Sequence, residues 1–189
     1  MSDPRPFPHL VDLRISDTAI DGVHLITQKQ ITDGRGTIRE FFRTSTYSGM
    51  LPAGCTWEQI NVTQTHKGAI RGLHGEAMVK LIACISGEAF GVYLDARDDS
   101  PTRGTVLQVP LRPGTQVLVP AGVCNAFQAT SDDGCEYLYC FTSEWTPGMV
   151  GVAYSPLDAA LGVEWPIPVD MTDTDQVSAK DAAAPPFFS

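Results

Sequence analysis

Short segments rich in apolar residues recur along the chain and are separated by polar, turn-forming connections. β-Branched and aromatic residues are frequent within these segments, and polar and apolar positions alternate in part, which is typical of strands in a two-layer or closed structure. The clearest segments are residues 22–31, 36–42, 80–87, 89–96, 104–111, 115–122 and 135–142. The pattern predicts a mostly β protein, built as a jelly roll or a closed barrel.

Turn signals and one helix signal divide the chain further. Pro120 and Gly122 end one predicted strand sharply, and residues 95–104 form a turn-rich connection. Helical periodicity is weak before the C-terminal third, where Ser178 can cap a short helix that Pro185 stops. The sequence contains no internal repeat, low-complexity tract or linker.

We expect residues 1–189 to form one domain, because the length is sufficient for one sizeable core. Within it we expect N-terminal strands in about residues 1–65 and a barrel core in about residues 66–145. A C-terminal segment of about residues 146–189, with a few short helices, is expected to pack back on the barrel.

Composition and charge narrow the classes of function. The net charge of −9 argues against a broad nucleic-acid surface, because phosphate backbones are bound by clustered lysines and arginines. No apolar run approaches the ~20 residues of a membrane-spanning helix. Residues 1–14 lack the basic start and apolar stretch of a signal peptide. We therefore expect a cytoplasmic protein that binds neither nucleic acid nor membrane.

The cysteines predict no disulfide framework. They are odd in number and form no C-x-x-C pair, so reduced, buried thiols are the better interpretation. The five positions are Cys55, Cys84, Cys124, Cys135 and Cys140. A single cysteine is a weak signal for a catalytic thiol, which leaves Cys124 a minor candidate for that role.

The stretch from Gly68 to Gly87 carries histidine, glutamate and lysine at a suggestive spacing. Gly68, His74 and Gly87 match the pattern G-x5-H-x-H-x3-E-x6-G. Glu76 stands at the second histidine position, and Lys80 stands at the carboxylate position. The stretch resembles the first metal-binding motif of the cupins, a family of small β-barrels, with two of its ligands replaced.

A second stretch follows the second cupin pattern, G-x5-P-x-G-x2-H-x3-N. Gly114, Pro120 and Gly122 are in register and supply its turns, but Asn125 replaces the histidine ligand. Of the four ligand positions in the two motifs, two carry side chains that commonly bind metal, whereas a cation needs three or four donors. We therefore expect a cupin-type barrel that holds an organic ligand and no metal.

Lys80 points to the chemistry of that ligand. A buried lysine is costly unless it meets a negative charge, and a site that generates an enolate provides one. His74 alone would more often be an ordinary histidine of a strand. A lysine six residues further on, inside the barrel, favours a functional pair.

Six segments of the chain carry further motifs in a fixed order. They are residues 33–42, 58–74, 119–127, 137–148, 157–166 and 178–185. Together they resemble the dTDP-4-dehydrorhamnose 3,5-epimerases and related nucleotide-sugar epimerases, almost from end to end. The resemblance implies an epimerase without metal or cofactor that acts on a 4-keto-6-deoxyhexose attached to a nucleoside diphosphate, with dTDP as the expected nucleotide.

The resemblance also implies the catalytic roles of four residues. A ketone at C4 acidifies the hydrogens at C3 and C5, and His74, in the motif R-G-L-H, matches the base that removes one of them. Asp181, in the motif S-x-x-D-A-A-A-P, matches the carboxylate that orients this base. Tyr139 matches the acid on the other face, although by itself it would be an ordinary strand aromatic. Lys80 matches the lysine beside the developing enolate oxygen.

A further set of residues matches substrate-binding positions of the family. Guanidinium groups suit a diphosphate, polar side chains suit the nucleotide and the sugar, and a tryptophan offers a flat face for stacking. The matches are Arg35 and Arg71 for the diphosphate, Glu40, Gln59 and Asn61 for nucleotide and sugar, and Trp145 for stacking. Without the resemblance, the arginines would be solvated surface charges and Trp145 would be as often a core residue. His66 carries no motif and is expected in a loop or on the surface.

The chain departs from the family at several positions of the pocket. Asn125 replaces the usual histidine, and because an amide can still donate a hydrogen bond we expect it to bind substrate while proton handling changes. The loop between His74 and Lys80 is shorter than usual. Gly75 and Ile38 stand where aromatic residues are common. These changes leave open whether C3, C5 or both carbons are inverted.

The sequence is also compatible with two other functions, and it carries an expectation about the oligomeric state. A catalytically silent homologue could bind nucleotide sugars, although retention of all four catalytic positions argues against it. A metal-dependent cupin enzyme is disfavoured by the missing ligands. The resemblance also implies a homodimer, in which the strand-rich N-terminal third could exchange between subunits and extend both sheets.

Overall fold

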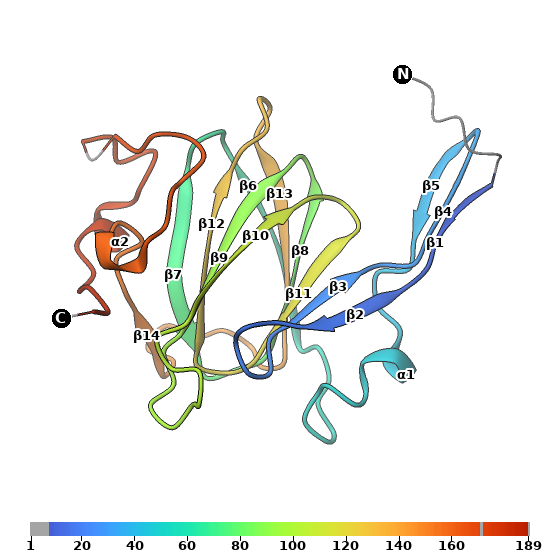
Figure 1. Ribbon diagram of the computed structural model, residues 1–189, viewed down its shortest axis with the longest axis horizontal. Helices are drawn as coiled ribbons and strands as arrows, with labels where there is room; N and C mark the ends of the chain where they lie inside the picture. Colours follow the sequence, from blue (N-terminus) through green and yellow to red (C-terminus); the bar gives the residue numbers. More distant parts are fainter. Residues whose placement is uncertain (1–7, 171, 189) are drawn as a thin grey trace.

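The computed structural model describes residues 8–170 and 172–188, which form strands and a few short helices (Figure 1). The strands are β1 (His9–Val11), β2 (Arg14–Asp17), β3 (His24–Thr27), β4 (Gln30–Asp33), β5 (Gly36–Arg39), β6 (Gln59–Thr65), β7 (Ile70–Glu76), β8 (Lys80–Ser86), β9 (Ala89–Asp95), β10 (Val106–Leu111), β11 (Thr115–Val119), β12 (Val123–Ala129), β13 (Cys135–Phe141) and β14 (Gly151–Ala153). The helices are α1 (Thr44–Tyr47), the 3-10 turn η1 (Ala159–Leu161) and α2 (Ala179–Ala182). No helix in these described residues is long and apolar enough to cross a membrane.

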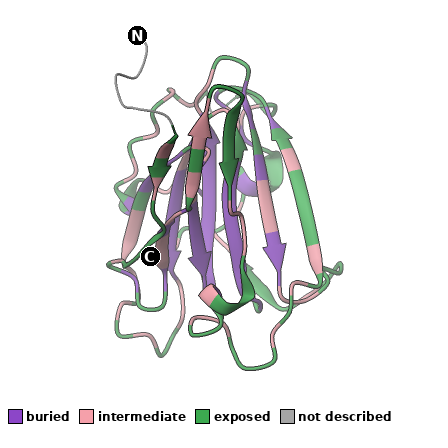
Figure 2. Cartoon of the chain, turned by 90° about the vertical axis from the view of Figure 1, so that its right-hand side faces the viewer, coloured by how far each residue is buried: buried purple, intermediate pink, exposed green. Residues whose placement is uncertain are grey.

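Two antiparallel sheets face each other and enclose the core (Figure 1). One sheet has the strand order β10-β9-β12-β7-β14 and the other the order β2-β3-β11-β8-β13-β6. Apolar side chains of both sheets meet between them, where Phe127 stacks on Tyr137 at a ring-centroid distance of 3.8 Å. The central strands are buried along most of their length, as the purple strands in Figure 2 show. The expected fold class, a mostly β jelly-roll barrel of the cupin kind, is confirmed.

The C-terminal segment packs on the outer face of the five-stranded sheet (Figure 1). Successive residues of a strand point to opposite faces, so Phe127 of β12 enters the core while its neighbour Ala126 faces outward. Leu161, Trp165 and Phe187 of the C-terminal segment cover this outer face. The segment therefore packs back on the barrel, as expected.

Strands β1, β4 and β5 form a separate three-stranded sheet that extends away from the barrel (Figure 1). We call these strands, residues 9–11 and 30–39, the arm. Apolar side chains lie exposed on it: Leu10 is 52% exposed, Ile31 41% and Ile38 72%. In the single chain the arm therefore presents apolar surface that the barrel does not cover.

Residues 22–31, one segment of the predicted strand pattern, are divided between two sheets. This segment forms β3, in the six-stranded sheet, and the first part of β4, in the arm. At the division the side chain of Gln28 is buried, and its backbone N–H donates to the carbonyl oxygen of Gly114. Apolar composition marked the strand residues but could not show that the chain changes sheets between them.

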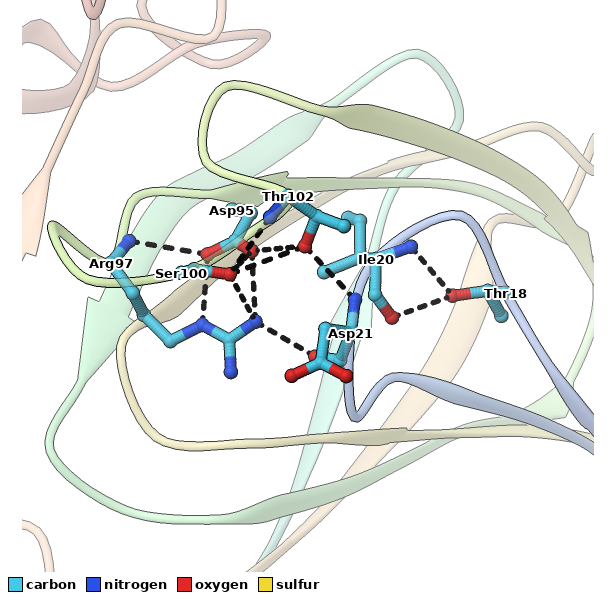
Figure 3. A network of polar contacts seen from close by, with 7 residues as sticks. All are labelled: Thr18, Ile20, Asp21, Asp95, Arg97, Ser100 and Thr102. Atoms are coloured by element: carbon cyan, nitrogen blue, oxygen red, sulfur yellow. Dashed lines mark hydrogen bonds and ion pairs between the residues drawn. The ribbon is translucent and has the colours of Figure 1, made fainter.

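A polar network ties the β9–β10 connection to the β2–β3 connection (Figure 3). The carboxylate of Asp95 has no solvent exposure and accepts hydrogen bonds from Arg97, Ser100 and Thr102. Arg97 also donates to the carbonyl oxygen of Asp21 at 2.7 Å. Burial by itself raises the pKa of Asp95, but the hydrogen bonds from Arg97 and the two hydroxyls outweigh burial and hold this pKa well below its usual range.

Candidate active site

A pocket of about 1280 Å³ opens between the two main sheets. Strands β7 and β12 of one sheet and β6, β8 and β13 of the other contribute side chains to its wall. The β13–β14 connection and α2 complete its rim. The volume is sufficient for a ligand of nucleotide size or larger.

The structure brings His74 and Asp181 together across 107 positions of sequence. Nε2 of His74, on β7, lies 2.8 Å from Oδ1 of Asp181, on α2. The hydroxyl of Ser178 accepts a hydrogen bond from the backbone N–H of Asp181, so the predicted cap of this short helix is confirmed. Burial is the largest single effect and opposes ionisation of Asp181, but the hydrogen bond and the charge of His74, with further hydrogen bonds, together outweigh it and lower the pKa of the carboxyl group.

Lys80, on β8, is almost completely buried, with its side chain 2% exposed. Its Nζ donates to Oε2 of Glu76 and to Oδ1 of Asn125, each at 2.5 Å. A third acceptor is the carbonyl oxygen of His74 at 3.2 Å. Burial is the largest single effect and raises the pKa of Glu76, but the charge and the hydrogen bond of Lys80, with the charge of His74, together outweigh it, so the net shift of this pKa is downward. The ammonium group is thus balanced by a carboxylate at the floor of the pocket.

Two glycines allow β7 to approach β12 closely, with His74 paired directly opposite Asn125. At Gly72, where φ is +119°, a Cβ atom would lie 2.5 Å from the carbonyl oxygen of Asn125. At Gly75 a Cβ atom would lie 2.8 Å from Sγ of Cys124. Packing against Cys124 therefore accounts for the glycine that stands where the family commonly has an aromatic residue.

Tyr139, on β13, lines the pocket from the six-stranded sheet, whereas His74 lines it from the five-stranded sheet. Its ring packs between those of Tyr137 and Phe141, at centroid distances of 5.0 and 5.6 Å. Burial raises the pKa of Tyr139 far above its ordinary value. The phenol is therefore protonated at neutral pH.

The expected binding residues Asn61, Arg71 and Trp145 also line the pocket. Nε of Arg71 donates to the hydroxyl of Thr65 at 3.0 Å, which orients the guanidinium group. Gln59 lies beside the pocket wall: its amide nitrogen donates to Oδ1 of Asn61, and its Oε1 accepts from the backbone N–H of Trp145. Gln59 is thus a neighbour that positions two wall residues.

Sequence reasoning missed three cationic or titratable residues of the wall, namely His66, Lys67 and Lys180. His66 and Lys67 directly precede the Gly68 turn, and Lys180 directly precedes Asp181. Their adjacency to motif residues was the available signal. Together with Arg71 they bring basic side chains to the wall, beside the acidic Asp173 and Asp175 of the same lining, and Lys67 is paired with Asp132 at 2.6 Å.

Arg35 and Glu40, both expected to bind substrate, are not among the residues that line this pocket. Arg35 lies in the turn between β4 and β5 of the arm, where it is 87% exposed at the side chain and pairs with Asp33. Glu40 directly follows the arm and pairs with Arg43. The arm that carries Arg35 extends away from the barrel of its own chain (Figure 1). The sequence match could not show this, because it gives the order of the motifs and not their positions in space.

The donor set of the pocket does not suit a metal ion. Among residues 8–170 and 172–188, no group of three or more histidine, cysteine, aspartate and glutamate side chains could hold one. Cys124 is completely buried beneath the wall, and burial raises its thiol pKa to about 12. The minor possibility of a catalytic thiolate at Cys124 is therefore not supported.

Comparison with known proteins shows that the chain is similar to nucleotide-sugar epimerases. The family model of dTDP-4-dehydrorhamnose 3,5-epimerase matches residues 17–188. A dTDP-4-dehydrorhamnose 3,5-epimerase of Salmonella typhimurium is 35% identical over 175 residues, which cover 89% of this chain and 92% of that protein. A dTDP-4-dehydro-6-deoxyglucose 3-epimerase of Streptomyces bikiniensis is 32% identical, with 77% of each chain covered.

The fold has equally clear solved counterparts. The crystal structure of a dTDP-6-deoxy-D-glucose-3,5-epimerase from Legionella pneumophila, in complex with dTDP-4-keto-L-rhamnose, superposes with a TM-score of 0.82 at 30% identity. The match covers 93% of both chains. A 4-keto-6-deoxy sugar epimerase from the novobiocin biosynthetic gene cluster of Streptomyces spheroides gives a TM-score of 0.84 at 25% identity, over 96% of this chain and 91% of that one.

Proposed function

The chain belongs to the dTDP-4-dehydrorhamnose 3,5-epimerase family, and from this premise we propose that it inverts C3, C5 or both carbons of a dTDP-linked 4-keto-6-deoxyhexose in deoxysugar biosynthesis. The observation that carries the proposal is the arrangement of the pocket. A histidine–aspartate pair and a protonated tyrosine enter it from opposite sheets, and a buried lysine lies at its floor. Relatives include both 3,5-epimerases and 3-epimerases, so the number of inverted carbons is a question for experiment.

In the proposed reaction His74 is the base. Asp181 accepts a hydrogen bond from Nε2–H of His74, which leaves Nδ1 as the basic atom. Nδ1 takes the acidic proton at C3 or C5, and the electron pair of the broken C–H bond moves onto the C4 oxygen as an enolate. Asp181 then stabilises the imidazolium, and the positive charge of Lys80 stabilises the enolate.

Tyr139 completes the inversion. Its hydroxyl donates a proton to the same carbon from the face opposite His74, and the C4 carbonyl re-forms. The phenolate that results recovers a proton from solvent in the open pocket, and the imidazolium releases one there. Base and acid are thus restored without a cofactor.

The rim residues bind the nucleotide in this proposal. Arg71, Lys67 and Lys180 provide basic groups that can bind the diphosphate, and Trp145, 49% exposed, provides a face on which a base or sugar can stack. Asn61 offers its amide group to the sugar.

We also propose that the protein is a homodimer in which the arm of each chain reaches the pocket of the other. The exposed Ile31 and Ile38 of the arm favour burial against a second copy. The outer strand β6 likewise exposes Ile60 and Val62, which are 59% and 55% accessible. Such an exchange would bring Arg35 and Glu40, which do not line the pocket of their own chain, to that of the partner chain.

The reaction is tested by incubating the protein with dTDP-4-keto-6-deoxyglucose in deuterium oxide and following C3 and C5 by NMR. We expect deuterium to enter at one or both carbons and the product configuration to invert at the same carbon. Binding of the sugar nucleotide without exchange at either carbon would identify a catalytically silent homologue and contradict the proposed enzyme.

A further inference from the structure

The ammonium group of Lys80 has no N–H donor left for a ligand. An ammonium carries three donors, and three protein oxygens accept from it: the carboxylate of Glu76, the amide of Asn125 and the carbonyl group of His74. To bond a substrate oxygen directly, Lys80 would have to abandon one of these acceptors, of which Asn125 is buried and the side chain of Glu76 is 22% exposed. An acceptor left without its partner in the interior costs free energy. Another residue is therefore the better candidate for the direct hydrogen bond to the substrate.

The same contact fixes the orientation of the Asn125 amide. An ammonium group donates and cannot accept, so the oxygen of Asn125 must face Lys80 and its Nδ2–H₂ group must face away. No described residue accepts a hydrogen bond from Nδ2. Among the described residues, five buried side-chain nitrogens or oxygens lack a partner, and Nδ2 of Asn125 is not one of them. The amide N–H groups therefore open on the pocket, whose wall Asn125 shares with His74.

We propose that Asn125 donates the direct hydrogen bond from Nδ2–H to the C4 oxygen as the enolate forms, with Lys80 acting through the amide oxygen. This inference rests on the proposed function and assigns a catalytic donor to it. A cation bonded to the oxygen of an amide draws electron density from its nitrogen, which makes the N–H a stronger donor. Donors fixed in advance on a developing oxyanion are among the largest contributions to catalysis.

The proposal explains why asparagine can stand where the cupin pattern and the family have histidine. The position has two tasks, to accept from Lys80 and to donate toward the substrate. An amide performs both with separate atoms and carries no proton that titrates near neutral pH. A neutral imidazole can perform both through its two ring nitrogens.

Three substitutions of Asn125 separate the tasks. Asn125→His keeps an acceptor and a donor, Asn125→Asp keeps the acceptor for Lys80 but has no N–H, and Asn125→Leu has neither. We expect deuterium exchange on dTDP-4-keto-6-deoxyglucose to fall by about 10²–10³-fold in the aspartate and leucine variants. The histidine variant should restore exchange to within about tenfold of the wild type. Affinity for dTDP, which lacks the sugar, should be the same in all four proteins and reports that the pocket has folded.

The outcomes discriminate between this inference and the proposed function. Exchange in Asn125→Asp at the wild-type rate would show that the residue serves only to hold Lys80, and would overturn the inference. Exchange in Asn125→His as low as in Asn125→Leu would overturn it as well. If the wild-type protein itself exchanged no hydrogen, the proposed function would be contradicted. The role of Asn125 would then be tested by measuring ligand binding. In that case Asn125→Leu should weaken binding of the 4-keto sugar nucleotide, but not of dTDP, by about tenfold, and equal weakening of both would contradict it.

Discussion

His74 and Tyr139 enter one pocket from opposite sheets, and this separation is what an inversion needs at the level of single residues. A group that removes a proton and a group that returns it must lie on different faces of the same carbon. If the returning group is absent, the enolate is protonated again from the side it came from, and hydrogen is exchanged without net change of configuration.

Replacement of Tyr139 by phenylalanine tests this division. The ring and its packing against Tyr137 and Phe141 are kept, and only the hydroxyl is lost. We expect solvent deuterium to enter the substrate at a rate within about tenfold of the wild type, because His74 and the enolate-stabilising groups remain. Net inversion should fall by about 10²–10⁴-fold. Both rates are measured by NMR on the same sample.

Equal loss of exchange and inversion in Tyr139→Phe would indicate a role in folding or binding rather than in proton donation. Unchanged inversion would mean that the acid is another group, with solvent in the pocket as the next candidate.

The sequence was sufficient to predict His74, Asp181, Tyr139 and Lys80 as a group that meets in one pocket, because each is part of a motif. It was not sufficient for the contacts among them. That the Lys80 donors are all taken, and that the Asn125 amide is thereby oriented, follows only from the positions of atoms on adjacent strands.

At the scale of elements, the Asp95 network joins two connections that lie far apart in the sequence (Figure 3). Because the pKa of Asp95 is lower in the folded state than in the unfolded state, the ionised carboxylate stabilises the fold. This contribution is fully present above the unfolded-state pKa of an aspartate, ~4. It is lost as the pH falls through the lower pKa of the folded state.

Asp95→Asn should therefore destabilise the protein at neutral pH by about 3–5 kcal/mol, because Arg97 and two hydroxyls lose a buried anionic partner. The difference from the wild type should shrink as the pH is lowered below ~4, because the carboxylate of the unfolded wild-type chain takes up a proton there while that of the folded state is still ionised. Urea unfolding followed by circular dichroism at several pH values measures both effects.

Asp98→Asn is the matched control for that experiment. Asp98 lies in the same connection, but its side chain is 91% exposed and its contact to Arg103 is 3.4 Å long. We expect a change within about 0.5 kcal/mol at every pH. A difference between Asp95→Asn and the wild type that did not depend on pH would contradict the assigned role of the ionised carboxylate.

Elements of the barrel were predictable where short segments rich in apolar, β-branched or aromatic residues lie between clear turns, as in β9, β10 and β13. The division of residues 22–31 between β3 and β4 was not, because composition is similar on both sides of it. Gly75 was read as a departure from the family, and the cause, the sulfur atom of Cys124 beneath it, lies on another strand. Close approach between strands leaves no signal in a single sequence.

At the scale of the whole molecule, the proposed exchange of arms makes each pocket the product of two chains. Arg35→Ala and His74→Ala should each be nearly inactive as pure proteins. If the two variants are unfolded and refolded together, half of the dimers contain one chain of each kind. In such a dimer one pocket has His74 and receives Arg35 from the other chain, so about a quarter of the wild-type activity should return.

Failure of the mixture to regain activity, while sedimentation shows that mixed dimers form, would mean that Arg35 serves its own chain or none. Sedimentation of the wild-type protein as a monomer at micromolar concentration would contradict the homodimer itself.

The base His74 and its partner Asp181 lie on two elements, β7 and the short helix α2, whose local stabilities differ. His74 is held by ladder hydrogen bonds on both sides of β7, whereas Asp181 lies on a four-residue helix in a segment of turns. A helix this short has little stability of its own and can open without the barrel. We expect activity to disappear at a lower urea concentration than the strand signal in circular dichroism, with the amide protons of residues 179–183 exchanging well before those of β7 and β12. Coincident loss of activity and strand signal would show instead that the helix and the barrel open as one unit.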